Sequence, residues 1–279
     1  ALSSAPEWAL RIPFLLMSLL GLVGVYLVAS RFVSRRAGVL ASVALATFPL
    51  YSLVARQAMT DMAFVGPMTL ALALGALALF DEEDEELSRR QRGRLSWPHH
   101  SLFYVTMALI GITVVPQLVV NAMSVTWTFG RAKTFSLPGI VLMLPYVAGL
   151  VAFVYYAART RYKAPFYLYL AAILCGLAIL AKGIAGLGLP VIVFVAYLLF
   201  TWNWKRLERS QLRYGILIAL LACATVAVPW HHAMLVRHGF PFWNELYGDN
   251  HWRRLVLGRH GERGTFEYFL RELRYAVLP

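Results

Sequence analysis

Apolar blocks long enough to cross a lipid bilayer recur along the chain, and charged residues are confined to the gaps between them. A helix needs about 20 apolar residues to cross the hydrocarbon core, where lipid offers no partner to an unpaired backbone amide. Of the 279 residues, 59% are hydrophobic and only 14% are charged, whereas soluble domains are about one-quarter charged. The sequence therefore predicts an all-α, polytopic transmembrane helical bundle.

We expect about eight spans. The apolar blocks place them at Trp8–Ala29, Gly38–Val54, Met62–Phe80, Ser101–Val120, Leu137–Ala157, Phe166–Ala181, Ile184–Trp202 and Tyr214–Trp230. Residues 1–230 then form the transmembrane region. Residues 231–279 form an extracytoplasmic segment, which we expect to include an amphipathic helix resting on lipid headgroups.

Lysine and arginine divide unevenly between the two sets of loops. The first, third, fifth and seventh loops carry fourteen: Arg31, Arg35, Arg36, Arg89, Arg90, Arg92, Arg94, Arg159, Arg161, Lys163, Lys205, Arg206, Arg209 and Arg213. The alternate loops carry four: Arg56, Arg131, Lys133 and Lys182. Basic residues in short loops favour the cytoplasmic side, so the alternate loops and the segment after the eighth span are expected outside. The basic residues behind the net charge of +12 lie in short loops rather than along one amphipathic face. A nucleic-acid partner is therefore not indicated.

Metal and disulfide chemistry receive little support from the sequence. Cys175 and Cys223 lie inside apolar blocks and are typical of small core residues. The histidines after the eighth span match no metal-ligand spacing such as H-E-x-x-H. We assign no metal ligand and no cofactor from these patterns, and leave a divalent metal open.

Asp61 is a candidate catalytic carboxylate. It follows Arg56 in the first outward loop, directly before the third span. An ionised carboxylate at a membrane boundary is costly unless it is paired or faces water, which favours a polar cavity in which Asp61 is a general base or anchors the acceptor and Arg56 lies nearby. The alternative is a helix N-cap formed by Thr60 or Asp61, and the two interpretations are compatible.

Lys182 is a candidate phosphate-binding residue. It precedes Gly183 at the outward hinge between the sixth and seventh spans, where an ammonium and an open backbone can approach an anion closely. The alternative is a snorkelling lysine that complements the carboxyl end of a helix. Spacing alone slightly favours the second interpretation.

The segment after Pro229 supplies the remaining candidates. Arg253 and Arg254 adjoin aromatic residues, as expected of a phosphate or carboxylate site beside a wall on which a sugar stacks. The alternative is an amphipathic helix on anionic headgroups. On the acceptor side we place polar residues of the same segment, namely His231, Asn250, His251 and His260.

Several short motifs, in this order, resemble the GT-C membrane glycosyltransferases, specifically the bacterial group that includes lipid A aminoarabinose transferase and protein O-mannosyltransferases. The resemblance extends over nearly the whole chain. The motifs are Trp-Ala-Leu-Arg-Ile-Pro from Trp8, Ala-Arg-Gln-Ala-Met-Thr-Asp-Met from Ala55, Ala-Lys-Gly from Ala181, Pro-Trp-His-His-Ala-Met from Pro229, His-Gly-Phe-Pro-Phe from His238 and Asn-His-Trp-Arg-Arg from Asn250.

The resemblance implies an inverting enzyme of the bacterial cytoplasmic membrane whose active site faces the periplasm or exterior. Its donor is a polyprenyl-phosphate-linked sugar, and its acceptor is a lipid, glycan or protein. In this family the principal catalytic aspartate precedes the first of these motifs, so we expect an N-terminal catalytic loop and a C-terminal region to lie outside this chain. The family often has proline after the lysine–glycine pair, where this chain has Ile184.

Two interpretations from other classes stay open. A lipid-linked sugar translocase, or another non-catalytic transporter, would place ionisable residues at mid-membrane. The expected spans lack charges at their centres, and this favours chemistry at the interface. A structural membrane subunit would use its outward segment to bind protein and would form no pocket there.

Overall fold

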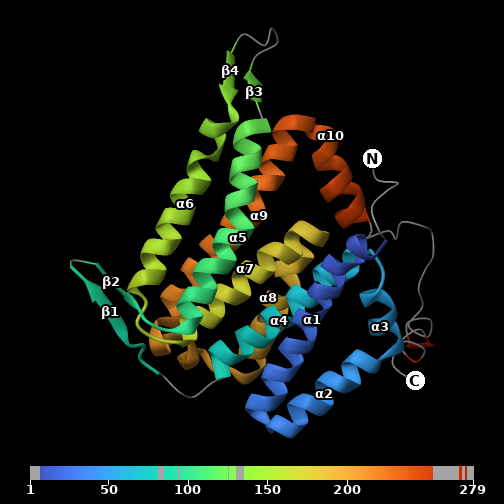
Figure 1. The fold of residues 1–279 in the computed structure, drawn as a ribbon, viewed down its shortest axis with the longest axis vertical. Coiled ribbons are helices and arrows are strands. Elements are labelled where there is room, and N and C mark those ends of the chain that lie inside the picture. Colours follow the sequence, from blue (N-terminus) through green and yellow to red (C-terminus); the bar gives the residue numbers. More distant parts are fainter. Residues whose placement is uncertain are drawn as a thin grey trace.

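The computed structural model describes residues 7–80, 85–93, 95–124, 126–129, 135–253, 270, 271 and 274. The helices are α1 (Glu7–Phe32), α2 (Arg35–Thr47), α3 (Pro49–Ala55), α4 (Thr60–Phe80), α5 (Ser101–Ser124), α6 (Gly139–Arg159), α7 (Ala164–Lys182), α8 (Ala185–Thr201), α9 (Leu212–His238) and α10 (Phe240–Trp243), with a 3-10 segment η2 (Trp204–Gln211) and a π-helical segment η3 (Asn244–Arg253). The predicted all-α bundle is confirmed (Figure 1).

Each of the eight predicted spans falls on helix. Among the described residues, six helices are long and apolar enough to cross a membrane: α1, α4, α5, α6, α7 and α9. The count becomes seven if α2 and α3 form one broken span, and α8, with 17 residues, is an apolar helix just short of the usual length. α9 continues through Trp230 to His238, eight residues beyond the predicted end of the last span.

The second span is broken rather than continuous. α2 and α3 meet at an angle of 71°. Pro49 is the first residue of α3, and Phe48 before it has ψ 128°, in the extended region. A residue before proline is disfavoured in the α conformation because it would clash with the proline ring, so the helix ends at Thr47 and restarts in a new direction.

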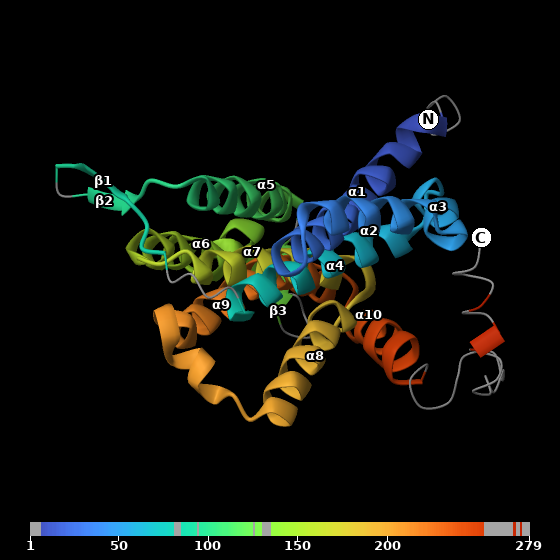
Figure 2. The ribbon, with the colours of Figure 1, turned by 90° about the horizontal axis from the view of Figure 1, so that it is seen from below.

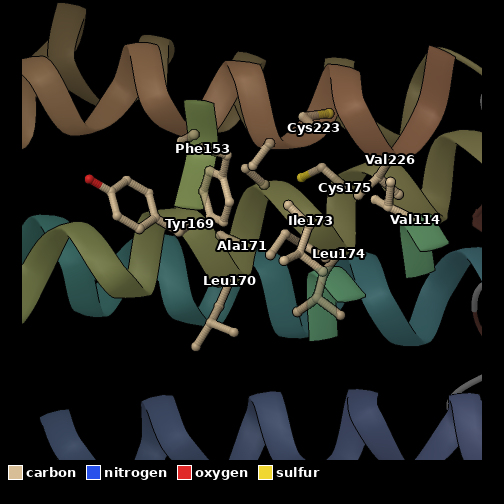
Figure 3. Close-up of a cluster of buried hydrophobic side chains, with 14 of the residues drawn as sticks. Val114, Phe153, Tyr169, Leu170, Ala171, Ile173, Leu174, Cys175, Cys223 and Val226 are labelled. Carbon is tan, nitrogen blue, oxygen red and sulfur yellow. The ribbon is translucent and has the colours of Figure 1, made fainter. Parts of the chain in front are cut away.

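α7 is the central helix of the bundle. Its buried side chains include Phe166, Tyr169 and Ile173, and they pack against residues of α4, α5, α6 and α9. Figure 3 shows this cluster, with Cys175 of α7 beside Cys223 of α9. Both cysteines are buried thiols, as predicted. Large apolar side chains elsewhere are exposed, for example Phe200 at 91%, which is the pattern expected where helices face lipid.

Small residues let α1 cross α4 closely. A β-carbon on Gly66 would overlap the backbone of Met17, and one on Gly24 would contact the backbone of Leu70. Close backbone approach at glycine is a common way for membrane helices to associate, because dispersion contacts replace the missing hydrophobic driving force. The Tyr51 hydroxyl of α3 also donates to the Ser18 carbonyl at 2.5 Å, tying the broken span to α1.

Two antiparallel hairpins were not predicted. β1 (Arg89–Arg92) pairs with β2 (Leu95–Pro98), and β3 (Thr126–Phe129) pairs with β4 (Phe135–Pro138). The Arg89 guanidinium donates to the carbonyls of Ala158 at 2.8 Å and Thr160 at 3.2 Å. The first hairpin is therefore anchored to the carboxyl end of α6, and two loops assigned to the same membrane side are joined.

Candidate functional site

The structure brings Asp61 and Lys182 into direct contact. Asp61 lies in the first turn of α4, and Lys182 is the last residue of α7. The Lys182 ammonium forms a hydrogen-bonded ion pair with the Asp61 carboxylate across 121 positions of sequence. Since a carboxylate is favoured at a helix N-terminus and an ammonium at a C-terminus, each partner stands at the helix end that stabilises its own charge.

This ion pair is open to solvent. The exposed fractions of the two side chains are 42% for Lys182 and 36% for Asp61. The ammonium also lies 5.9 Å from the centre of the Phe64 ring. A pair with this exposure contributes at most about 1 kcal/mol to stability, so its groups are available for interaction with a ligand.

α4 begins at Thr60, which places Asp61 inside the helix rather than at its N-cap. Arg56 is exposed at the carboxyl end of α3, in the short segment that leads to Asp61. The loop therefore presents Arg56 and Asp61 on the side of the bundle where α7 ends.

His251 joins the C-terminal segment to the end of α7. Its Nε2 lies 3.1 Å from the Lys182 carbonyl oxygen, and its Nδ1 contacts the Leu246 carbonyl oxygen five residues earlier in η3. Both ring nitrogens thus face hydrogen-bond acceptors. The ring therefore bridges η3 and the carboxyl end of α7 through its two nitrogens.

Gly183 makes this docking possible. Its φ of 75° and ψ of −155° suit glycine alone, and its amide bonds to the Ile179 carbonyl at the end of α7. A β-carbon at this position would overlap the imidazole of His251. The lysine–glycine pair therefore combines a charged group with a site that receives the C-terminal segment.

A cavity of about 630 Å³ adjoins this junction. Apolar residues of α7, α8 and α9 form much of its wall, including Ile179, Leu187 and Leu220. Polar and aromatic side chains complete it: Tyr146, His231, His232, Trp243 and Tyr247. Cavities of this size and mixed lining are typical of small-molecule sites.

Aromatic rings connect the cavity to His251. Tyr247 stacks on His251 with ring centres 5.4 Å apart, and Trp243 lies 4.4 Å from Tyr247. Burial raises the pKa of the Tyr247 hydroxyl, so this group stays protonated and can donate a hydrogen bond at neutral pH.

Sequence reasoning did not single out His232, Tyr146 or Tyr247. His232 Nδ1 lies 2.8 Å from the Tyr146 hydroxyl, which fixes the ring against α6. His231, the residue before it, was predicted as a site residue and also lines the cavity. Its Nδ1 lies 2.8 Å from the Ala227 carbonyl oxygen. A doubled histidine at the end of a span could have indicated both rings.

The other predicted residues lie further along η3. Arg253 pairs with Asp249 at 3.1 Å and is two residues from His251. The Asn250 side chain donates to the Glu245 carbonyl at 3.0 Å. The structure does not bring Arg253 or Asn250 into contact with the Asp61–Lys182 pair. Arg254 and His260 lie outside the described residues.

Within the part of the chain that the structure describes, no group of three or more His, Cys, Asp or Glu side chains is arranged to hold a metal ion.

The long apolar helices, with charged side chains gathered at their ends, define a multi-pass α-helical membrane protein. Two family models match it under one description, dolichyl-phosphate-mannose-protein mannosyltransferase, one over residues 1–115 and the other over residues 102–239. The chain belongs to the GT-C group of membrane glycosyltransferases. No solved structure matches it.

Curated relatives carry bacterial transferase names. The chain is 33% identical over 106 residues to undecaprenyl phosphate-alpha-4-amino-4-deoxy-L-arabinose arabinosyl transferase 1 of Pseudomonas fluorescens, a match that covers 38% of this chain and 18% of the relative. Similarly named transferases match from Pseudomonas aeruginosa, at 33% identity over 38% of this chain and 18% of the relative, and from Shewanella sediminis, at 31% over 52% and 26%. The chain thus spans about a fifth to a quarter of the length of these relatives.

Proposed function

We propose that this chain is part of an inverting glycosyltransferase that takes a sugar from a polyprenyl-phosphate carrier and passes it to a lipid, glycan or protein acceptor at the outer face of a bacterial cytoplasmic membrane. The observation that carries the proposal is the Asp61–Lys182 ion pair, which places a carboxylate beside an ammonium at the ends of two membrane helices. The relatives are named as undecaprenyl phosphate-alpha-4-amino-4-deoxy-L-arabinose arabinosyl transferases, and this supports the donor class.

The reaction needs a cation and a carboxylate close together. The acceptor oxygen attacks the anomeric carbon, the bond from that carbon to the phosphate oxygen breaks with its electron pair on the leaving polyprenyl phosphate, and the acceptor proton passes to a carboxylate. Lys182 stabilises the departing phosphate, with Arg253 and Arg254 as further phosphate contacts. Asp61 orients or deprotonates the acceptor hydroxyl.

The cavity of about 630 Å³, whose lining includes Ile179 of α7 and Tyr247 of η3, supports a lipid-linked donor. Its apolar wall of α7, α8 and α9 residues suits an isoprenoid chain, and its rim of His231 and Tyr247 suits a polar group. In this proposal Arg56, His231, Asn250, His251 and His260 contact the sugar or the acceptor. The donor phosphate then lies near Lys182, where the cavity meets η3.

The test is sugar transfer by the full-length protein in proteoliposomes that contain an undecaprenyl-phosphate-linked sugar, with release of undecaprenyl phosphate as the readout. We expect Lys182→Met to lower kcat/KM for the donor strongly, and the double variant Arg253→Ala/Arg254→Ala to abolish release, while the proteins stay folded. The control is Arg90→Ala, an exposed arginine on the β1–β2 hairpin. Wild-type turnover in Lys182→Met would overturn the assignment of the phosphate site, and sugar movement across the membrane without release of undecaprenyl phosphate would favour a translocase.

A further inference from the structure

A second cavity lies between α6, α7 and the start of α9, at the end of the bundle that carries the basic loops. Its volume is about 530 Å³, and the Asp61–Lys182 pair is not part of its lining. Polar side chains line it where α6 ends and α9 begins: Arg159, Thr160, Tyr169 and Gln211. Leu217, Ile218 and Leu221 of α9 form an apolar wall. The cavity therefore has one charged, polar part and one lipid-like part.

Arg159 supplies the charge at this cavity. It is exposed in the last turn of α6, and its guanidinium lies 4.2 Å from the centre of the Tyr155 ring. A guanidinium presents paired N–H donors that match the oxygens of a phosphodiester. Stacking on a tyrosine face limits its freedom and lowers the entropic cost of binding.

The helix end beside Arg159 is already neutralised. The last carbonyls of α6 carry negative partial charge, which disfavours an anion. Arg89 donates to the carbonyl of Ala158 in the last turn and to that of Thr160, the residue directly after the helix. The nearby carboxylate of Glu85 is paired with Lys163 at 3.0 Å. Arg159 is the one charged residue among the described residues that line this cavity.

Hydroxyl groups line the inner part of the cavity. The Tyr169 hydroxyl lies 3.0 Å from Thr160 Oγ1, and both residues are buried. Figure 3 shows this hydroxyl directed away from the apolar cluster around Cys175. When Thr160 donates to the Tyr156 carbonyl at 3.2 Å, it accepts from Tyr169, whose oxygen can still accept a hydrogen bond from a ligand.

The opposite wall faces the membrane. Leu217 and Tyr214 on α9 are exposed at 66% and 72%, so a ligand can enter sideways from the bilayer. In Figure 2, α8 and the segment that leads from it to the start of α9 project below the rest of the bundle. Tyrosines such as Tyr156 and Tyr214 are enriched at the level of lipid headgroups.

We propose that this cavity binds one anionic phospholipid from the leaflet on the basic side of the protein. Arg159 holds the phosphodiester, Gln211 and the Tyr169 hydroxyl contact the glycerol or headgroup, and one acyl chain lies along Leu217 and Leu221. Basic cavities between membrane helices on the cytoplasmic side commonly bind such headgroups. The site is independent of the proposed sugar transfer.

The experiment is native mass spectrometry of the full-length protein in a neutral detergent, titrated with palmitoyl-oleoyl phosphatidylglycerol or phosphatidylcholine. We expect one phosphatidylglycerol to be retained at saturation, and Arg159→Gln to weaken its binding about tenfold, as loss of a charged hydrogen bond does. Leu217→Trp, at an exposed lining position, should also weaken it with Arg159 in place. Arg90→Gln removes one charge from the same end of the protein and should bind like the wild type.

Four outcomes would overturn the site. They are equal retention of phosphatidylcholine, unchanged phosphatidylglycerol binding in Arg159→Gln, an equal loss in Arg90→Gln, and full competition by glycerol 3-phosphate. The third would indicate attraction to charge in general. The fourth would indicate a site for free phosphate that does not use the apolar wall.

Discussion

The imidazole of His251 occupies the space that a β-carbon on Gly183 would fill. The two residues lie 68 positions apart, and the contact holds η3 against the carboxyl end of α7, where Lys182 pairs with Asp61. A single glycine therefore decides whether the C-terminal segment can lie beside the ion pair.

Gly183→Ala should release η3. The new methyl group displaces His251, and alanine at φ 75° adds backbone strain of about 1–3 kcal/mol. We expect faster hydrogen exchange in residues 244–253 and a lower thermal midpoint in detergent. Gly188→Ala is the control, because a β-carbon there meets nothing within 4 Å. Unchanged exchange in Gly183→Ala would contradict the docking.

Asp61 and Lys182 should couple weakly in stability and strongly in activity. A double-mutant cycle with Asp61→Asn and Lys182→Met should give a coupling free energy of unfolding of at most about 1 kcal/mol, because both side chains are more than one-third exposed. In transfer assays we expect Lys182→Met to raise the KM for the donor and Asp61→Asn to lower kcat. A large stability loss with normal kinetics would assign the pair a structural role alone.

Arg89 and Arg90 should differ although they are adjacent. Arg89 bonds to the end of α6. Arg90, the next residue of β1, lies on the other face of the strand, and its cross-strand partner is Trp97 of β2. Arg89→Ala should lower the free energy of unfolding by about 1–3 kcal/mol, since charge-assisted bonds to two carbonyls are lost. Arg90→Ala should change it little, and chemical denaturation of both variants distinguishes them. Equal effects would mean that the hairpin is not anchored through Arg89.

The assignment of loops to two sides can be checked by cysteine labelling. Cys175 and Cys223 are buried, so they give little background with a membrane-impermeant maleimide. We expect Gln57→Cys and Asn244→Cys to react from one side of intact vesicles, and Ser88→Cys and Trp204→Cys only after permeabilisation. If Asn244→Cys and Ser88→Cys reacted from the same side, the proposed active site would lose its outward position.

The sequence predicted the helices well because the bilayer requirement is local. Twenty apolar residues identify a span wherever its neighbours lie, so all eight predicted segments fall on helix. The break before Pro49 was not predicted, although the effect of proline on Phe48 is local too. The hairpin from Arg89 to Pro98 was missed because a strand of exposed charges has no alternating apolar pattern.

The candidate site was only partly predictable. Placing both Asp61 and Lys182 on the outward side followed from the distribution of lysine and arginine, but their direct contact depends on how α4 packs against α7. The contact between His251 and the Lys182–Gly183 segment was not predictable either, because no local sequence pattern predicts a bond between an imidazole and a carbonyl of another helix. Long-range packing decides these contacts.

The bend between α2 and α3 affects how deep the ionic site lies. At about 1.5 Å per residue, the 13 residues of α2 extend about 20 Å and the seven of α3 about 10 Å. Turned by 71°, α3 adds only a few ångströms along the direction of α2, and the pair falls short of a hydrocarbon thickness of about 30 Å. If α2 runs along the membrane normal, the bilayer must thin around α3. Local thinning then brings water and lipid headgroups to the level of Asp61.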